Sequence, residues 1–266
     1  MCRSFDEPSM SDVFNSAIHD YIVDFESFVL GCNKELLTSA GILFNDQISS
    51  GRSCCKYNDG RGKINISQEF LDRIAEGLLY RDGDNLKIFF DKTGFSAVIA
   101  HDKNKELYWY IAFSTAICAI KFHEVAHCLK SHSPGVSSTE SMRQEDEADR
   151  LAGMMMNWYS DFLIKQVSTK YPFVRSDQAE SFCHNNIIFS LMYVIYKSYE
   201  LIDGDSLNYQ YSLVRSGQMI VFFLCEIVKQ RPRFKQAIED RARCIMSNFR
   251  YVFKWHEFYD IDVHLR

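Results

Sequence analysis

The sequence predicts an α+β fold in which a small β-sheet with a hairpin precedes a mainly helical domain. Three short segments, 63–67, 86–90 and 95–99, place apolar residues at every second position, which is typical of strands. From 105 to 132 the chain contains neither glycine nor proline and is apolar on nearly all faces, which is typical of a buried helix. Apolar residues at helical spacing continue through the C-terminal half.

The N-terminal elements follow in order. Apolar residues at a helical period over 12–30, behind Ser11 as a plausible N-cap, predict a first helix. After a polar stretch, 63–67 alternates like a strand, and Ser67 is placed to cap a helix over 68–80.

The predicted hairpin has strands at 86–90 and 95–99, joined by a turn at Asp91-Lys92-Thr93-Gly94. The long central helix over 105–132 ends at Pro134-Gly135, and four further helices are predicted at 139–167, 176–202, 207–229 and 232–256. No repeat or polar linker divides the chain. We therefore expect a single domain over 1–266, with an N-terminal helical region at 1–61, a core at 62–230 and a C-terminal helix at 231–266.

Composition excludes some classes of function. The 266 residues are 47% apolar, which supports a large core, and 30 basic against 35 acidic residues give a net charge of -5. No long basic cluster supports nucleic-acid binding. The apolar stretches are shorter than the ~18 residues of a membrane-spanning helix, so no membrane partner is expected.

The cysteines and the N-terminus both favour a cytoplasmic location. The first residues contain no apolar segment typical of a secretion signal. The nine cysteines are scattered, and Cys118, Cys183 and Cys225 lie inside apolar runs, which suits reduced thiols in a core.

The central helix contains an HExxH sequence from His123 to His127. Histidines four residues apart stand on one face of a helix, so both can bind one metal ion. Catalytic zinc takes three protein ligands and a water molecule, which a neighbouring carboxylate can deprotonate. The motif therefore predicts Zn²⁺ at His123 and His127, with Glu124 as the general base. Such a short motif also arises by accident in about one chain in a hundred.

A third ligand is available on the next predicted helix. Glu145 lies eighteen residues beyond His127, after a turn that folds the two helices against each other. Asp149, one helical turn later, is placed to accept the remaining N–H of a ligand imidazole. Ala148 beside it is small enough for close helix approach. An acidic first turn favoured by the helix dipole accounts for the same carboxylates without a metal.

At these residues the chain resembles the gluzincin zinc metallopeptidases, whose HExxH is followed by a helix bearing ExxAD, here Glu145, Ala148 and Asp149. The longer spacing from His123 to His132 looks like that of membrane-embedded CAAX-protease-type and of Lit-type families. Because no apolar segment is long enough for a membrane span, the soluble Lit-type phage-exclusion peptidases are the closest resemblance, over roughly 62–230. This resemblance implies a zincin-like core and cleavage of a specific intracellular protein.

The resemblance is incomplete downstream. Relatives often carry a His-Pro pair and a later Arg, where this chain has Tyr209 and Arg215. A phenol or a guanidinium can stabilise the oxyanion formed on a scissile carbonyl, so both are candidates, with core packing as the alternative. His132 follows His123 by nine residues, against ten in metzincins. We expect a continuing helix to point it away from the metal, as a helix-end or substrate-loop residue. We also expect Glu147 to face elsewhere than Glu145.

The sequence thus predicts a zinc-dependent endopeptidase acting on a protein or peptide, with an activating partner left open. An extended substrate would pair with an edge strand at 86–100 or 63–67. One alternative is a regulatory peptidase that cuts a repressor. Another is a zinc-containing toxin or partner-binding module without catalysis, although structural zinc usually has four protein ligands and only three are evident.

Overall fold

The structure is a computed structural model that describes residues 43–49, 54–58, 61–94, 102–133, 136–170, 176–201 and 207–253. The predicted helix at 12–30 and the second predicted hairpin strand at 95–99 lie outside these residues.

A three-stranded sheet is the first described feature of the chain. It consists of β1 (Leu43–Ser49), β2 (Cys54–Asn58) and β3 (Arg61–Ser67), in the order β1-β3-β2. β1 runs parallel to β3, and β2 runs antiparallel to it. The strand predicted at 63–67 is confirmed as part of β3. It is the central strand, however, so its backbone is paired on both sides and does not offer the expected free edge.

A capped helix follows the sheet directly. The side chain of Ser67 accepts a hydrogen bond from the Phe70 N–H at 3.3 Å, which starts α3 (Gln68–Glu76). A π-helical turn, η1 (Gly77–Arg81), continues it. The predicted helix at 68–80 and its Ser67 cap are therefore confirmed.

The predicted hairpin strand at 86–90 is wrong, because these residues lie in α4 (Gly83–Thr93). Four buried side chains follow a helical period: Leu86, Phe89, Phe90 and Thr93. Ile88, which fits the alternating pattern, is 46% exposed. Gly94, at φ 76°, ends the helix in the left-handed region, so the expected hairpin turn is a helix C-terminus.

The predicted α+β class with a β-hairpin is wrong, and the described residues form a mainly helical fold. Helices dominate the described residues, and the segment expected to form the hairpin belongs to them. The strands that are described lie upstream, against the side of a helical bundle. Phe89 explains why the helical period prevails, because its ring packs on Phe189 and Phe249 of the bundle, with centroids 4.9 and 5.9 Å away.

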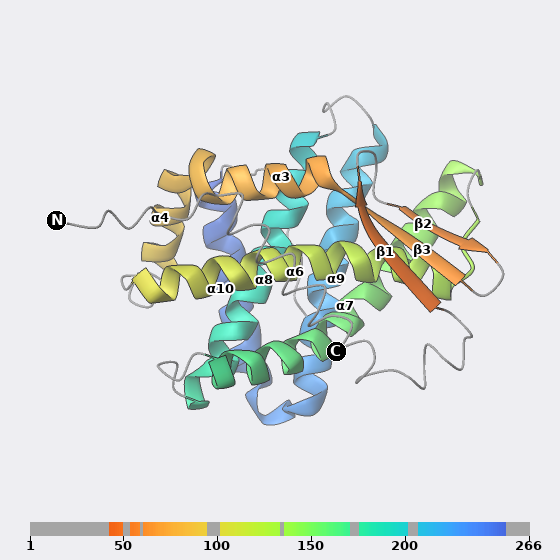
Figure 1. Ribbon diagram of the computed structural model, residues 1–266. Helices are drawn as coiled ribbons and strands as arrows, with labels where there is room; N and C mark the ends of the chain where they lie inside the picture. The colour runs from red at the N-terminus through yellow and green to blue at the C-terminus, as the bar shows by residue number, and fades with distance from the viewer. Residues whose placement is uncertain are drawn as a thin grey trace.

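The bundle is built around one central helix. Figure 1 shows α6 (Asp102–Leu129) crossing the middle of the molecule, with the strands near its C-terminal end. Both β2 and β3 contact α6. The other described elements of the bundle are α7 (Ser138–Lys170), α8 (Ser176–Leu201), α9 (Leu207–Gln230), the short 3₁₀ turn η2 (Pro232–Phe234) and α10 (Lys235–Val252). These bounds agree with the predicted helices to within a few residues.

Small residues bring α7 close to its neighbours. Ala148 and Ala152 are fully buried, and α7 packs on both α6 and α9. At Gly153 a Cβ atom would lie 2.4 Å from the carbonyl oxygen of Met219 on α9, so only glycine fits this crossing. In the described part of the chain, no helix combines the length and the apolar character needed to cross a bilayer.

Candidate metal centre

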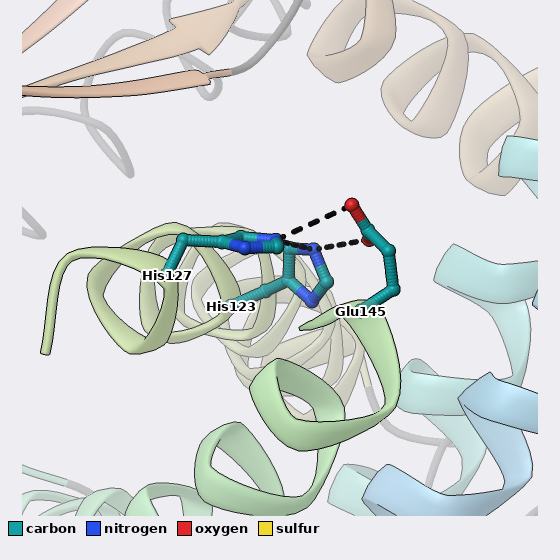
Figure 2. Close-up of side chains that lie close together, drawn as sticks. All are labelled: His123, His127 and Glu145. Atoms are coloured by element: carbon teal, nitrogen blue, oxygen red, sulfur yellow. Dashed lines mark hydrogen bonds and ion pairs between the residues drawn. The ribbon is translucent and has the colours of Figure 1, made fainter. Parts of the chain in front are cut away.

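The two histidines of the HExxH sequence face each other across one turn of α6. The Nε2 atoms of His123 and His127 lie 3.0 Å apart, because residues four apart share one helical face. Both side chains are half-buried. Figure 2 shows them directed toward the same point in front of the helix.

Glu145 approaches the same point from α7. One carboxylate oxygen lies 3.2 Å from His123 Nε2, and the other lies 3.5 Å from His127 Nε2 (Figure 2). Atoms bound to one tetrahedral zinc ion at ~2.1 Å lie about 3.4 Å from one another. The nitrogen and oxygen atoms of the three side chains, which all lie within 4.8 Å of one another, therefore fit a single zinc ion.

Asp149 contacts the other ring nitrogen of His123, the one that does not face Glu145. Its Oδ1 atom lies 2.7 Å from His123 Nδ1, and its side chain is only 5% exposed. A neutral imidazole with its Nε2 atom toward the metal carries its proton on Nδ1 and donates it to this carboxylate. The structure therefore brings Asp149 to the position that the sequence predicts.

The charges around His123 favour a cation at this point. Burial by itself lowers the pKa of His123, but the carboxylates of Asp149 and Glu145 outweigh it and raise the pKa to about 10. Without a metal, a proton on His123 satisfies these carboxylates. A bound metal ion must displace that proton, because ligand imidazoles are neutral.

Glu124, the predicted general base, lies next to His123 on α6 and is half-buried. Its role in proton transfer stays a prediction.

His132 does not point away from the site as expected. α6 ends at Leu129, and the chain then turns back, so that His132 Nδ1 lies 2.8 Å from His127 Nδ1. The description of His132 as a helix-end residue is correct, but the assumption of a continuing helix is wrong. Burial, the largest influence, lowers the pKa of His132 and favours its neutral form.

Glu147 faces away from the metal-facing atoms, as predicted, but it contacts His132. Its Oε2 atom lies 3.2 Å from His132 Nε2. Arg143 binds its other oxygen and also pairs with Glu140. Sequence reasoning missed this group of residues, because the turn signal Pro134-Gly135 lies three residues beyond Ser131, the residue at which the chain turns.

The candidates for oxyanion stabilisation cannot be placed at the site. Tyr209 and Arg215 lie on α9, and their side chains are outside the part of the structure that is described. Their assignment stays a prediction.

Among the cysteines whose side chains are described, one departs from the sequence prediction. Cys118, Cys183 and Cys225 are not in disulfide bonds, as expected for a reduced core. Cys128, the residue after His127, is disulfide-bonded. The expectation of reduced cysteines is therefore wrong for this position.

Comparison of the chain with models of protein families, with curated proteins and with solved structures finds no match.

Proposed function

We propose that this chain is a zinc-dependent endopeptidase, with His123, His127 and Glu145 as metal ligands. The observation that supports the proposal most is the convergence of two imidazole nitrogens and one carboxylate from two helices within 4.8 Å. Three protein ligands are typical of catalytic zinc, which keeps a coordination position for water, whereas structural zinc usually has four. The HExxH and ExxAD sequences that supply these atoms also support a gluzincin type of peptidase.

The chain's own residues supply the remaining chemistry. Zinc in this position would act as a Lewis acid toward water and a peptide carbonyl. Glu124 accepts the proton of the attacking water and returns it to the leaving amine. Asp149 keeps the proton of His123 on Nδ1, so that Nε2 stays available as a ligand.

A strand edge near α6 offers a place for an extended substrate. Neither edge expected from the sequence is present in the described residues, because 86–93 lie in α4 and 63–67 lie in the central strand β3. β2 is an outer strand of the described sheet and contacts the helix that carries the histidines. We therefore propose that a substrate segment pairs with the backbone of β2.

The cellular location of such a substrate is part of the proposal. The resemblance to Lit-type peptidases favours an intracellular protein in the cytoplasm. The disulfide at Cys128 does not fit this location, because disulfides persist mainly in oxidising compartments. Fractionation of cells that produce the tagged chain would decide between the cytoplasm and an oxidising compartment.

The first experiment measures metal content. Purified protein should bind about one zinc per chain, because the ligands form one site. His123→Ala, His127→Ala and Glu145→Ala should each lose it. Asp146→Ala is the matched control, since Asp146 neighbours Glu145 but pairs with Arg150 instead, at 2.9 Å. Zinc retained by the histidine variants would contradict the site.

The second experiment separates a peptidase from a binding module. Glu124→Gln keeps the shape and hydrogen-bonding reach of the side chain but removes the carboxylate that accepts the proton. It should keep the zinc and lose at least ~10²-fold in cleavage, the usual contribution of a general base. Cleavage can be measured as new N-termini after wild type or variant is incubated with a cell lysate. Cuts that are equally frequent with the variant, or no cuts with the zinc-loaded wild type, would contradict the peptidase.

A further inference from the structure

The turn that ends α6 brings a third histidine against the second one of the HExxH sequence. We propose that His132 and Glu147 are positioning residues that orient His127 for metal binding through a chain of two hydrogen bonds. The inference rests on the proposed metal site. It adds a role for two residues that the sequence pattern leaves outside the ligand set.

The backbone of the turn explains how His132 reaches His127. Ser131 adopts a φ of 53°, in the left-handed region. Its N–H donates to the carbonyl of Cys128, and the N–H of His132 donates to the carbonyl of His127, both at 3.0 Å. This pair of hydrogen bonds defines a Schellman motif, in which the last residue commonly packs back on the final helical turn. Here the contact is made by two imidazole rings, with centroids 5.0 Å apart.

The hydrogen-bonding capacity of the two imidazoles decides which atom donates and which accepts in each hydrogen bond. His127 turns its Nε2 atom toward His123 and Glu145, so a metal-bound His127 carries its proton on Nδ1. That proton is donated to His132 Nδ1 at 2.8 Å, which leaves the proton of His132 on Nε2. His132 Nε2 then donates to Glu147 at 3.2 Å. Each ring thus has one donor and one acceptor, and both are used.

His132 and Glu147, at the far end of this series of hydrogen bonds, are held in place by their surroundings. The side chain of His132 is 6% exposed, so its imidazole ring is shielded from water. Glu147 is fixed by Arg143, one turn earlier on α7, and Arg143 is held in turn by Glu140. The two ligand histidines are therefore both tied to carboxylates of α7. Asp149 contacts His123 directly, whereas Glu147 acts on His127 through His132.

The inference is tested by the affinity for zinc, measured by competition with a chromophoric chelator at fixed pH. His132→Leu removes both hydrogen bonds and should weaken zinc binding ~10- to 100-fold at unchanged stoichiometry. His132→Asn can still accept from His127, so it should recover part of the loss. Glu147→Ala should weaken binding less than His132→Leu. Asp146→Ala, in the same region of α7, should have no effect.

The absorption spectrum of the cobalt-substituted protein supplies a second readout. A role confined to folding would leave the geometry of the bound metal unchanged, whereas a tilted His127 should shift the visible bands in His132→Leu. Ser131→Gly should preserve affinity and spectrum, because glycine tolerates the left-handed turn, while Ser131→Val should reproduce the shift. Circular dichroism of the metal-free variants confirms that they are folded.

The possible outcomes distinguish the two proposals. Wild-type affinity and spectrum in His132→Leu would overturn the positioning role and leave the proposed zinc site standing. Complete loss of zinc from His132→Leu, but not from Glu147→Ala, would also overturn it, because His132 would then be a ligand. A wild-type protein that binds no zinc would contradict the proposed function itself.

Discussion

Two carboxylates on α7 that are two residues apart contact different histidines. Glu145 faces the Nε2 atoms of His123 and His127, and Glu147 faces His132. Residues two apart on an α-helix point about 200° away from each other, so only one of them can reach the metal-facing atoms. Asp149 lies four residues after Glu145 and returns to the same face, where it meets the other nitrogen of His123.

At Asp149, substitution should affect the metal without removing a ligand. Asp149→Ala leaves the Nδ1 proton of His123 without its acceptor, so zinc affinity should fall ~10- to 100-fold, with one zinc still bound at saturation. Asp149→Asn keeps an acceptor oxygen but not the charge, so its zinc affinity should fall less than that of Asp149→Ala. Titration against a chelator measures both effects. Equal affinity in all three proteins would mean that the contact with Asp149 does not influence the metal.

Among the helices, α4 shows how two periods can coexist in one sequence. Leu86, Ile88 and Phe90 satisfy the alternation of a strand, while Leu86, Phe89, Phe90 and Thr93 satisfy the period of a helix. Both patterns are present over so few residues that periodicity alone does not separate them. The aromatic contacts of Phe89 and Phe90 with Phe189 on α8 decide for the helix.

The crossing of α7 and α9 depends on one glycine. Gly153→Ala would place a methyl group 2.4 Å from the Met219 carbonyl oxygen and 3.0 Å from Phe222 Cβ, so the helices must move apart. We expect a loss of about 1–3 kcal/mol in the free energy of unfolding, as for overpacked cores. Urea denaturation measures it.

The control for this substitution is Gly83→Ala, at the first position of α4. A Cβ atom there meets nothing within 4 Å, so its stability should be unchanged or slightly higher. If Gly153→Ala were as stable as this control, the close approach of α7 and α9 would be wrong.

At the scale of the whole molecule, one hydrophobic cluster extends from Phe70 on α3 to Phe253 after α10. The central helix α6 contributes to this core along much of its length and carries the candidate ligands His123 and His127 near its C-terminal end. A buried ion pair joins distant parts of the bundle, with Lys197 on α8 2.8 Å from Asp82 at the start of α4. The helix that carries two of the candidate ligands is thus part of the main core of the described residues.

Because His184 is buried in the core, its protonation should make the stability of the protein depend on pH. This side chain on α8 is 15% exposed, lies near Glu180 and the ring of Phe223, and has its pKa lowered to about 4 by burial. The unfolded chain binds a proton at a pKa near 6.5, so stability is complete above pH 6.5 and is lost as pH falls toward 4.

His184→Gln removes this titration and should flatten that part of the pH dependence. The difference in slope between the two proteins should be at most about 1.4 kcal/mol per pH unit, the value for one proton. Chemical denaturation at pH 7.5 and at pH 5 measures it, with Glu180 and its partner Arg231 unchanged in both proteins. The same slope in wild type and variant would place the titration elsewhere.

The long helices and the spacing of the candidate metal ligands could be predicted from the sequence. A glycine-free, apolar segment predicted α6, and the spacing of His123, His127, Glu145 and Asp149 predicted which side chains meet, because helical geometry is local and regular. The cap at Ser67 is equally local, since it depends on residues within one turn.

Other features depend on contacts between residues that are far apart in the chain. The helical state of 86–93 depends on aromatic contacts with helices about a hundred residues away, which no local pattern records. The contact of His132 with His127 depends on a left-handed residue at Ser131, where glycine, the usual sign of such a turn, is absent. The central place of β3 in its sheet depends on pairing with two other strands. Helix period and capping are short-range effects. The turn after α6, the strand order and the choice between helix and strand at 86–93 are set by packing between distant residues.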